Sequence, residues 1–360
     1  MAIERPPNQL FIPANSSIYE ISPWEIGTFD PPTKAFAPLR YVGSNFSGGS
    51  IPEDGTCIQG FDNIGLVVGT SSSLFNQGYL QINKTDAPQR IKEWVGEKLE
   101  ELGNENSDVS YWVNPFYQLN REGNTNAGEH VLPLVDGGED LQNIPLHPLL
   151  QPVRGVDVIF AVDSSADTRS PGGHWPNGTA LIATYQRSLL TSGHGVPFPS
   201  IPDQNTFVNL GLNSKPTFFG CDANNQTQPT PLIVYIPNSP YTYNSNITTV
   251  QMETNDTERN AIIQNGYNVA TRGNGTLDNE WASCVGCAML ARSFWKTQTE
   301  IPSTCQNCFS RYCWNGTTNT TVPSPYDPTH AIKMSGCANG ARLAPAAVLL
   351  SLIGFLTLLP

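Results

Sequence analysis

The sequence has little positive charge and few histidines. Its 360 residues include 19 lysines and arginines against 31 aspartates and glutamates, so the formal net charge is -12 at pH 7. A nucleic-acid-binding protein needs a basic surface, and this balance argues against that class. The five histidines leave few candidates for the base of a serine hydrolase triad, and none has a supporting local pattern.

Several motifs that carry chemistry are absent as well. The sequence contains no P-loop, no G-x-G-x-x-G, no H-E-x-x-H and no EF-hand pattern, which removes the usual support for nucleotide, zinc-protease or calcium-loop functions. G-x-S-x-G, the nucleophile elbow of α/β hydrolases, is also missing. Residues 69–73, GTSSS, have only the outline G-x-S-x-S, and Ser71 fits a packed turn or a helix N-cap better than a nucleophile.

The first residues, MAIERPPNQLFIPANSS, lack the apolar segment of a secretory signal peptide. This contrasts with ten Asn-x-Ser/Thr triplets, which favour a glycosylated secretory protein over a chance excess of Asn and Thr. We therefore expect the sequence to begin part-way into a longer protein. The triplets start at Asn15, Asn45, Asn83, Asn177, Asn225, Asn246, Asn255, Asn274, Asn315 and Asn319.

The other end resembles the signal for a glycosylphosphatidylinositol (GPI) anchor. Residues 343–360, LAPAAVLLSLIGFLTLLP, carry no charge and follow the small residues SGCANGA, as such a signal requires. A transmembrane helix is disfavoured because nothing polar follows the tail. The candidate attachment residues are Ser335, Gly336 and Asn339. We expect an anchored protein at the extracellular face of the plasma membrane or in the cell wall.

Four of the eight cysteines occur as two C-x-x-C pairs, Cys284 with Cys287 and Cys305 with Cys308. This spacing suits either a zinc ribbon or disulfides. The glycosylation triplets and the anchor signal indicate an oxidising compartment, so disulfides are favoured. The spacing leaves their connectivity open.

Strands alternating with helices predict an α/β fold. The β-branched run 153–162 predicts a central parallel strand, and 231–237 a second strand. Helices are expected at 91–102, 179–190, 259–265 and 281–295. We divide the chain into a catalytic-domain part (1–316), a Thr/Pro/Ser-rich stalk with the anchor site (317–342) and the hydrophobic tail (343–360).

The segment 132–150, LPLVDGGEDLQNIPLHPLL, carries the main candidate site. An apolar run ends at Asp136, and Gly137 and Gly138 follow, which allow a sharp turn because glycine accepts unusual backbone angles. The turn would leave the Asp136 carboxylate at the end of a strand, where α/β enzymes place their chemistry. Other acids compete for this role. Asp163 and Asp167 follow the next strand, and Glu139 and Asp140 are better explained as helix caps.

Residues 135–167, VDGGEDLQNIPLHPLLQPVRGVDVIFAVDSSAD, closely resemble the fungal secreted lysophospholipase / phospholipase B family and, more distantly, the catalytic domain of cytosolic phospholipase A2. Segments such as GFDNIGLVVGTSSSLFNQ and CVGCAMLARSF resemble the same family. The resemblance covers about residues 18–315 and implies a patatin-like α/β fold whose N-terminal half is missing here.

The resemblance also implies a Ser-Asp dyad with Asp136 as its acid, supported by the turn residues Gly137, Gly138, Asn143 and Pro145. The family's nucleophile belongs to a G-x-S-G-[GS] elbow, which this sequence lacks, so this chain alone is expected to be inactive. Substrates would be lysophospholipids and phospholipids, and no metal or cofactor is implied. The alternative is a non-catalytic GPI-anchored surface glycoprotein derived from the family.

Overall fold

The structure is a computed structural model that describes residues 1–6, 12–70, 109–168, 173–190, 196–222, 230–247, 251 and 253–333. Several sequence-based predictions lie outside these residues. They are the helix at 91–102, the tail 343–360, Ser71, Asn83, Asn225, Ser335, Gly336 and Asn339.

The first part of the chain forms a six-stranded sheet in the order β4-β3-β2-β1-β6-β5, with every neighbouring pair antiparallel. The short strands alternate with Pro- and Gly-containing turns, which keep each one to six residues or fewer. Both faces of β6 are buried, with Leu134 in one apolar cluster and Val135 in another. The strands are β1 (Ala2–Glu4), β2 (Ile18–Ile21), β3 (Glu25–Thr28), β4 (Ala35–Pro38), β5 (Ser110–Val113) and β6 (Val131–Asp136).

A second sheet has three strands in the order β7-β9-β8, with β7 (Val158–Asp163) parallel to β9 (Leu232–Pro237) and β8 (Thr217–Phe219) antiparallel to it. The parallel strand expected at 153–162 is therefore confirmed in direction but wrong in position. Within the described residues β9 is central and β7 is an edge. The alternating burial of β7 agrees with this, because Val162 is 65% exposed while every residue of β9 is buried.

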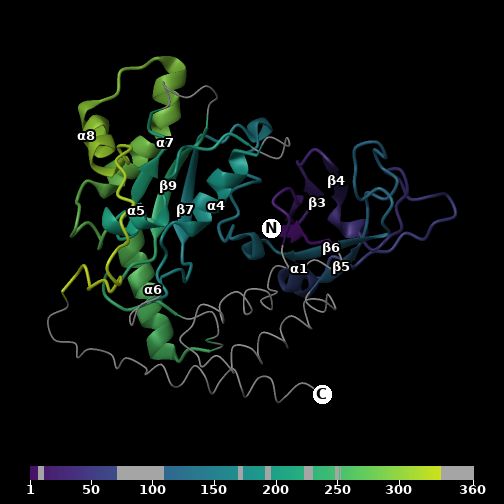
Figure 1. Ribbon diagram of the computed structural model, residues 1–360, viewed down its shortest axis with the longest axis horizontal. Helices are drawn as coiled ribbons and strands as arrows, with labels where there is room; N and C mark the ends of the chain where they lie inside the picture. Colours follow the sequence, from purple (N-terminus) through teal and green to yellow (C-terminus); the bar gives the residue numbers. More distant parts are fainter. Residues whose placement is uncertain are drawn as a thin grey trace.

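Helices cover both faces of the three-stranded sheet (Figure 1). On one face α4 (Thr179–Ser188) and α5 (Gln204–Asn209) pack through an apolar cluster that includes Leu181, Phe207 and Tyr235. On the other face α6 (Asp256–Ala270), α7 (Trp281–Thr297) and α8 (Ser303–Tyr312) share a cluster. The helices expected at 179–190, 259–265 and 281–295 are confirmed as α4, α6 and α7. No helix was expected at α5 or α8. The remaining helix, α1 (Ile64–Thr70), packs against the six-stranded sheet. The fold is mixed α/β.

Three disulfides hold the helical end, as the sequence predicted over zinc. Cys284 pairs with Cys308 and Cys287 with Cys305, so two bonds join α7 to α8. The third bond, Cys221–Cys313, ties the end of α8 to the segment after β8. No helix among the described residues has the length and apolar character needed to cross a bilayer.

Two short 3-10 helices lie between β6 and β7, η2 (Gly137–Asp140) and η3 (Pro152–Arg154). This connecting segment runs from the six-stranded sheet to the three-stranded sheet, which lie side by side in Figure 1. Asp136 and its turn therefore stand at the junction of the two sheets.

Candidate active site

Asp136 is the last residue of β6 and pairs in register with Ala2 of β1. Its Oδ1 accepts a hydrogen bond of 2.8 Å from the backbone N–H of Gly138, so the carboxylate is also the N-cap of η2. Within the part of the chain that the structure describes, Oδ2 has no hydrogen-bond partner. One oxygen is thus fixed by the backbone, and the other is available to accept a proton from a reacting group.

The sequence predicted glycine at positions 137 and 138 for unusual backbone angles, but the structure shows a different cause. Neither has a positive φ, so the turn does not need unusual backbone angles at these positions; Leu141 is the left-handed residue, at φ 60°. A Cβ on Gly137 would stand 2.7 Å from Met1 Cε, and a Cβ on Gly138 would stand 2.9 Å from Asn143 Oδ1. Close approach of the Asn143 amide therefore explains Gly138, whereas the flexible end of Met1 could move away from a side chain at Gly137.

Burial raises the pKa of Asp136 above its ordinary value, and this effect exceeds the lowering by the Gly138 N–H and by the charge of the Met1 amino group. A carboxylate with a raised pKa binds a proton more readily at a given pH. The environment therefore makes Asp136 a better base than an exposed aspartate.

Asn143 and Pro145, the other expected turn residues, are both exposed. Asn143 nevertheless has a defined contact, because its Nδ2 donates a 2.9 Å hydrogen bond to Ser165 Oγ beyond the end of β7. Its Oδ1 faces Gly138. The structure thus brings Asn143 to the Asp136 turn and connects it to the second sheet.

The competing acids near the turn have structural partners. Glu139 Oε2 lies 3.3 Å from the guanidinium of Arg5, and both side chains are buried. Asp140 accepts a 2.6 Å hydrogen bond from Gln142. Burial raises the pKa of Asp140, with that hydrogen bond and the charge of Arg187 acting in the opposite direction. These residues therefore have structural contacts of their own: Glu139 joins η2 to Arg5, the residue after β1, and Asp140 joins it to Gln142.

Asp163, the acid at the end of β7, also has structural hydrogen-bond partners. Asp163 is 1% exposed and accepts hydrogen bonds from Tyr235 Oη at 2.8 Å and from the Ser165 N–H at 2.9 Å. Both carboxylate oxygens are used, so Asp163 is poorly placed to act as a base. Asp167 accepts from the Asn177 N–H at 3.2 Å.

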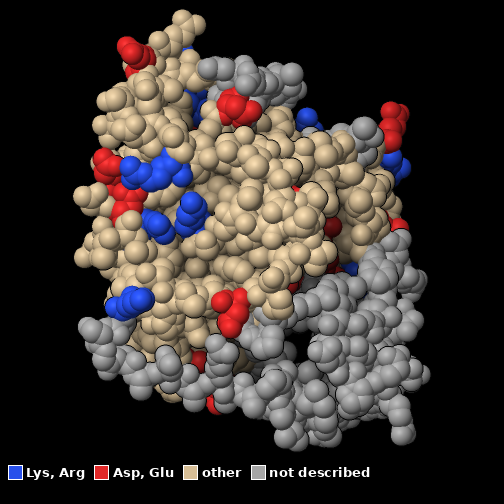
Figure 2. Space-filling model, turned by 60° about the vertical axis from the view of Figure 1, so that its left-hand side comes forward, with Lys and Arg blue, Asp and Glu red and all other residues tan. Residues whose placement is uncertain are grey.

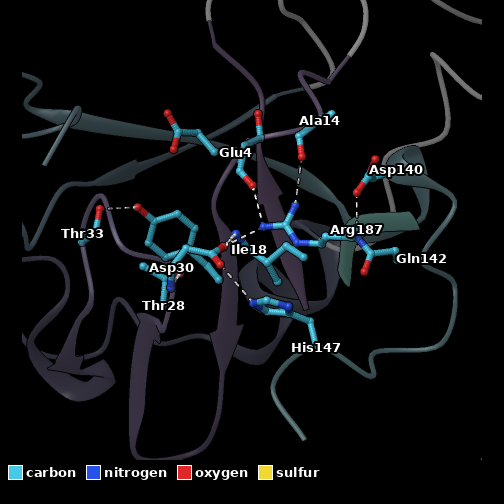
Figure 3. A network of polar contacts seen from close by, with 12 residues as sticks. Glu4, Ala14, Ile18, Thr28, Asp30, Thr33, Asp140, Gln142, His147 and Arg187 are labelled. Atoms are coloured by element: carbon cyan, nitrogen blue, oxygen red, sulfur yellow. Dashed lines mark hydrogen bonds and ion pairs between the residues drawn. The ribbon is translucent and has the colours of Figure 1, made fainter. Parts of the chain in front are cut away.

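A buried ionic network lies beside the turn (Figure 3). Asp30 is at its centre, with Arg187 Nη2 at 2.9 Å from Oδ2 and His147 Nε2 at 3.1 Å from Oδ1. The backbone N–H of Ile18 donates to the same carboxylate at 2.7 Å. Burial raises the pKa of Asp30, but the hydrogen bond and charge of His147, the charge of Arg187 and the Ile18 amide outweigh it, so the pKa is lowered.

No local sequence pattern indicated the partners in this network. Asp30 and Arg187 are 157 residues apart, and neither belongs to a motif. His147 lies between a leucine and a proline in the sequence, and its buried contact with Asp30 gives it a structural role. Ser165 and Tyr235 were missed for the same reason as Arg187, since only the packing of distant segments brings them to the site.

Eight of the ten asparagines that begin glycosylation triplets lie among the described residues. Five of them are exposed, which leaves room for a glycan. Asn177, Asn246 and Asn319 are half-buried, and Asn246 Nδ2 donates to the Gly173 carbonyl at 2.6 Å. The exposed asparagines are Asn15, Asn45, Asn255, Asn274 and Asn315.

An open hollow of about 570 Å³ lies where the start of α7 meets the C-terminal ends of α6 and α8. It carries both charges, because Arg311 forms ion pairs with Asp278 and Glu280 at 2.6 Å. Figure 2 shows Lys and Arg side chains gathered beside Asp and Glu on the face that carries these helices. Asp136 does not line this hollow. Across the described ranges no group of three or more His, Cys, Asp or Glu side chains is arranged to hold a metal ion.

A mixed α/β fold with a carboxylate after a strand, one of whose oxygens has no hydrogen-bond partner among the described residues, is compatible with a hydrolase. A family model described as the lysophospholipase catalytic domain matches residues 1–319, and the chain belongs to this family. The resemblance noted from the sequence is therefore confirmed at the level of the family. No solved structure matches the chain.

Curated relatives carry the same designation. The chain is 58% identical to a lysophospholipase of Penicillium chrysogenum over 327 residues, which are 90% of this chain and 53% of the relative. It is 56% identical to lysophospholipase 1 of Aspergillus fumigatus, covering 90% and 51% of the two chains. Identity to lysophospholipase 1 of Saccharomyces cerevisiae is 47% over 321 residues, covering 87% and 48%. The chain spans about half the length of these relatives.

Proposed function

We propose that this chain supplies the acid-bearing part of a lysophospholipase / phospholipase B, with Asp136 as the base of a Ser-Asp dyad. The observation that carries the proposal is the state of the Asp136 carboxylate. One oxygen is held by the Gly138 N–H, the other has no partner within the described residues, and burial raises the pKa. Family membership and the names of the relatives support the reaction class.

In the proposed reaction a serine hydroxyl attacks the acyl carbonyl carbon of a lysophospholipid or phospholipid, and its proton passes to Asp136 Oδ2. Backbone N–H groups hold the oxyanion. Collapse of the intermediate breaks the ester bond, and the leaving alkoxide takes the proton from Asp136. Water then attacks the acyl-serine, gives its proton to Asp136, and the fatty acid departs as the proton returns to the serine.

The nucleophile is proposed to lie outside these 360 residues, because the sequence contains no G-x-S-G-[GS] elbow. We therefore expect no hydrolysis by this chain alone. The patatin-like arrangement of the complete domain is part of the same proposal.

The test is a chimaera in which this chain replaces the matched 327-residue segment of the Penicillium chrysogenum lysophospholipase. Release of fatty acid from lysophosphatidylcholine is expected from the chimaera and not from this chain alone. Asp136→Asn should remove at least about 10³-fold of the activity, as expected for loss of a catalytic base. A folded chimaera without activity would favour the non-catalytic surface glycoprotein. Activity of the isolated chain that depends on Ser71 would contradict the proposed origin of the nucleophile.

We also propose that the protein is an extracellular glycoprotein held by a GPI anchor, which would keep it near lipid substrate. Five exposed triplet asparagines support glycosylation. The anchor rests on the sequence of residues 335–360 alone. Expression of this chain behind a secretory signal in a fungal host, followed by enzymatic deglycosylation and release by phosphatidylinositol-specific phospholipase C, tests both parts.

A further inference from the structure

We propose that Ser165, Asp163 and Tyr235 are positioning residues for Asp136, acting through Asn143 on the turn that holds its carboxylate. The inference rests on the proposed role of Asp136 and deepens it, because it states what keeps the proposed base in place. Each of the three side chains comes from the three-stranded sheet or its edge, whereas Asp136 ends a strand of the other sheet.

The hydrogen-bond chain begins inside the three-stranded sheet. Tyr235 on β9 is fully buried, and its Oη donates to Asp163 Oδ2 at 2.8 Å. The backbone N–H of Ser165 donates to the other oxygen, Oδ1, at 2.9 Å. With both oxygens bonded, Asp163 fixes the first residues after β7 and thereby the position of the Ser165 side chain.

The next hydrogen bond in this series connects the three-stranded sheet to the Asp136 turn. Ser165 Oγ accepts a 2.9 Å hydrogen bond from Asn143 Nδ2. The second polar atom of that amide, Oδ1, stands 2.9 Å from the place where a Cβ of Gly138 would be, and Asp136 Oδ1 stands 3.3 Å from the same place. Asn143 is therefore packed against the residue whose N–H bonds the Asp136 carboxylate.

A carboxylate as deeply buried as Asp163 is costly unless its oxygens are bonded. An apolar side chain would fill the same space at the end of β7 without that cost. The series of hydrogen bonds instead fixes an orientation. It determines where the Ser165 hydroxyl points and therefore where the Asn143 amide points. A directed contact of this kind suits a carboxylate that must be held in one orientation for proton transfer.

The test is a set of double-mutant cycles on the full chain, measured by urea unfolding at pH 7. If Ser165 supports the ionised Asp136 carboxylate, Ser165→Ala costs more in the wild-type background than in the Asp136→Asn background, because a neutral amide gains less from the Gly138 N–H. The expected coupling is about twofold or more in the unfolding constant. The matched control pairs Ser165→Ala with Asp140→Asn, an acid of the same turn that bonds Gln142 instead, and is expected to be additive.

Two further variants make the result specific. Ser165→Thr keeps the hydroxyl and should retain the coupling, and Asn143→Ala should abolish it. If Ser165→Ala does not fold, Tyr235→Phe removes one donor to Asp163 and replaces it in the cycle. Equal coupling to Asp136 and Asp140, or additivity with both, would reduce Ser165 to a packing role and overturn the proposal.

Activity of the chimaera gives an independent readout. Ser165→Ala should lower kcat about tenfold or more with little change in KM, and Ser165→Thr should restore it. A wild-type chimaera without hydrolysis would defeat the proposed function and leave the stability cycles interpretable. An active, Asp136-dependent chimaera that is indifferent to Ser165→Ala would defeat the positioning role alone.

Discussion

Arg187 Nη2 donates to Asp30 Oδ2 across 2.9 Å, with both side chains at most 5% exposed. The contact bonds α4, on the three-stranded sheet, to the loop between β3 and β4 of the six-stranded sheet (Figure 3). Arg187 also donates to the Ser16 carbonyl at 3.0 Å. The two sheets are thus joined by buried ionic and hydrogen bonds close to the Asp136 turn.

Removal of one partner of this ion pair is expected to destabilise the fold strongly. Arg187→Met leaves the Asp30 carboxylate buried with one cation fewer, and the expected loss is about 3–5 kcal/mol of unfolding free energy. Arg259→Met is the control, because its ion pair with Asp256 is exposed and should contribute less than about 1 kcal/mol. Urea unfolding followed by tryptophan fluorescence measures both changes. Equal losses of unfolding free energy would show that the buried ion pair contributes no more to stability than the exposed one.

Asp136 and Asp30 should have opposite effects on stability as the pH changes. The raised folded-state pKa of Asp136 means that its stabilising contribution is complete below the ordinary value of 3.8 and is lost as the pH rises through the folded-state pKa. Asp136→Asn should therefore stabilise the chain at neutral pH, with no difference remaining below about pH 3.

Asp30 has a lowered pKa, so its contribution is present above 3.8 and is lost as the pH falls through the folded-state pKa. Asp30→Asn should destabilise the chain at neutral pH, and the difference should shrink in acid. Melting temperatures between pH 3 and pH 8 test the pair. The same sign for both variants at pH 7 would contradict the assigned environments.

Gly138→Ala should lower the turnover of the chimaera more than it lowers the stability of the fold. The added Cβ meets Asn143 Oδ1 at 2.9 Å and Asp136 Oδ1 at 3.3 Å, so the carboxylate must move, and a shift near 1 Å lowers turnover by as much as about 10²-fold. Gly155→Ala is the matched control. Gly155 has φ 58° and open space around it, so this change costs about 1–2 kcal/mol of stability and leaves turnover intact. Chimaera kinetics and unfolding free energies separate the two cases.

Opening the disulfides between α7 and α8 is expected to lower the stability of the fold substantially. The double substitution Cys284→Ser with Cys308→Ser opens a bond with a sequence separation of 24 and should cost about 2–4 kcal/mol. Cys57→Ser alters an exposed free cysteine and should stay within about 0.5 kcal/mol. Non-reducing peptide mapping checks the pairing directly. Four titratable thiols at these positions, together with destabilisation by a chelator, would support the zinc alternative instead.

The exposed side of β7 should promote self-association. Phe160 and Val162 are 39% and 65% exposed on β7, which has a neighbour on one side only within the described ranges, and an apolar edge strand favours association with other chains. Phe160→Ser with Val162→Thr is expected to lower the sedimentation coefficient at high protein concentration. Val153→Thr changes a residue that is 80% exposed but lies in η3, off the sheet, and should have no such effect.

Local patterns predicted much of the chain. The apolar run before Asp136 became β6, the run 231–237 became β9, and the helices around α4, α6 and α7 formed where their spacing indicated. The C-x-x-C spacing also favoured disulfides over zinc in the oxidising compartment that the sequence indicates, although their connectivity, Cys284–Cys308 and Cys287–Cys305, became known only from the packing of α7 against α8. These features depend on residues close together in sequence, which is why the sequence reveals them.

The sequence by itself determined the family, the preference for disulfides over zinc at the two C-x-x-C pairs, and the acid that precedes two glycines. Tertiary structure decided which acid remains available. Asp163 is bonded through both oxygens, whereas Asp136 keeps one oxygen without a partner among the described residues. It also decided why Gly138 must be glycine, since the reason is the approach of Asn143 and not a backbone angle. The physical cause is the same in each case: burial and close contact arise between segments far apart in sequence, and no local pattern encodes them.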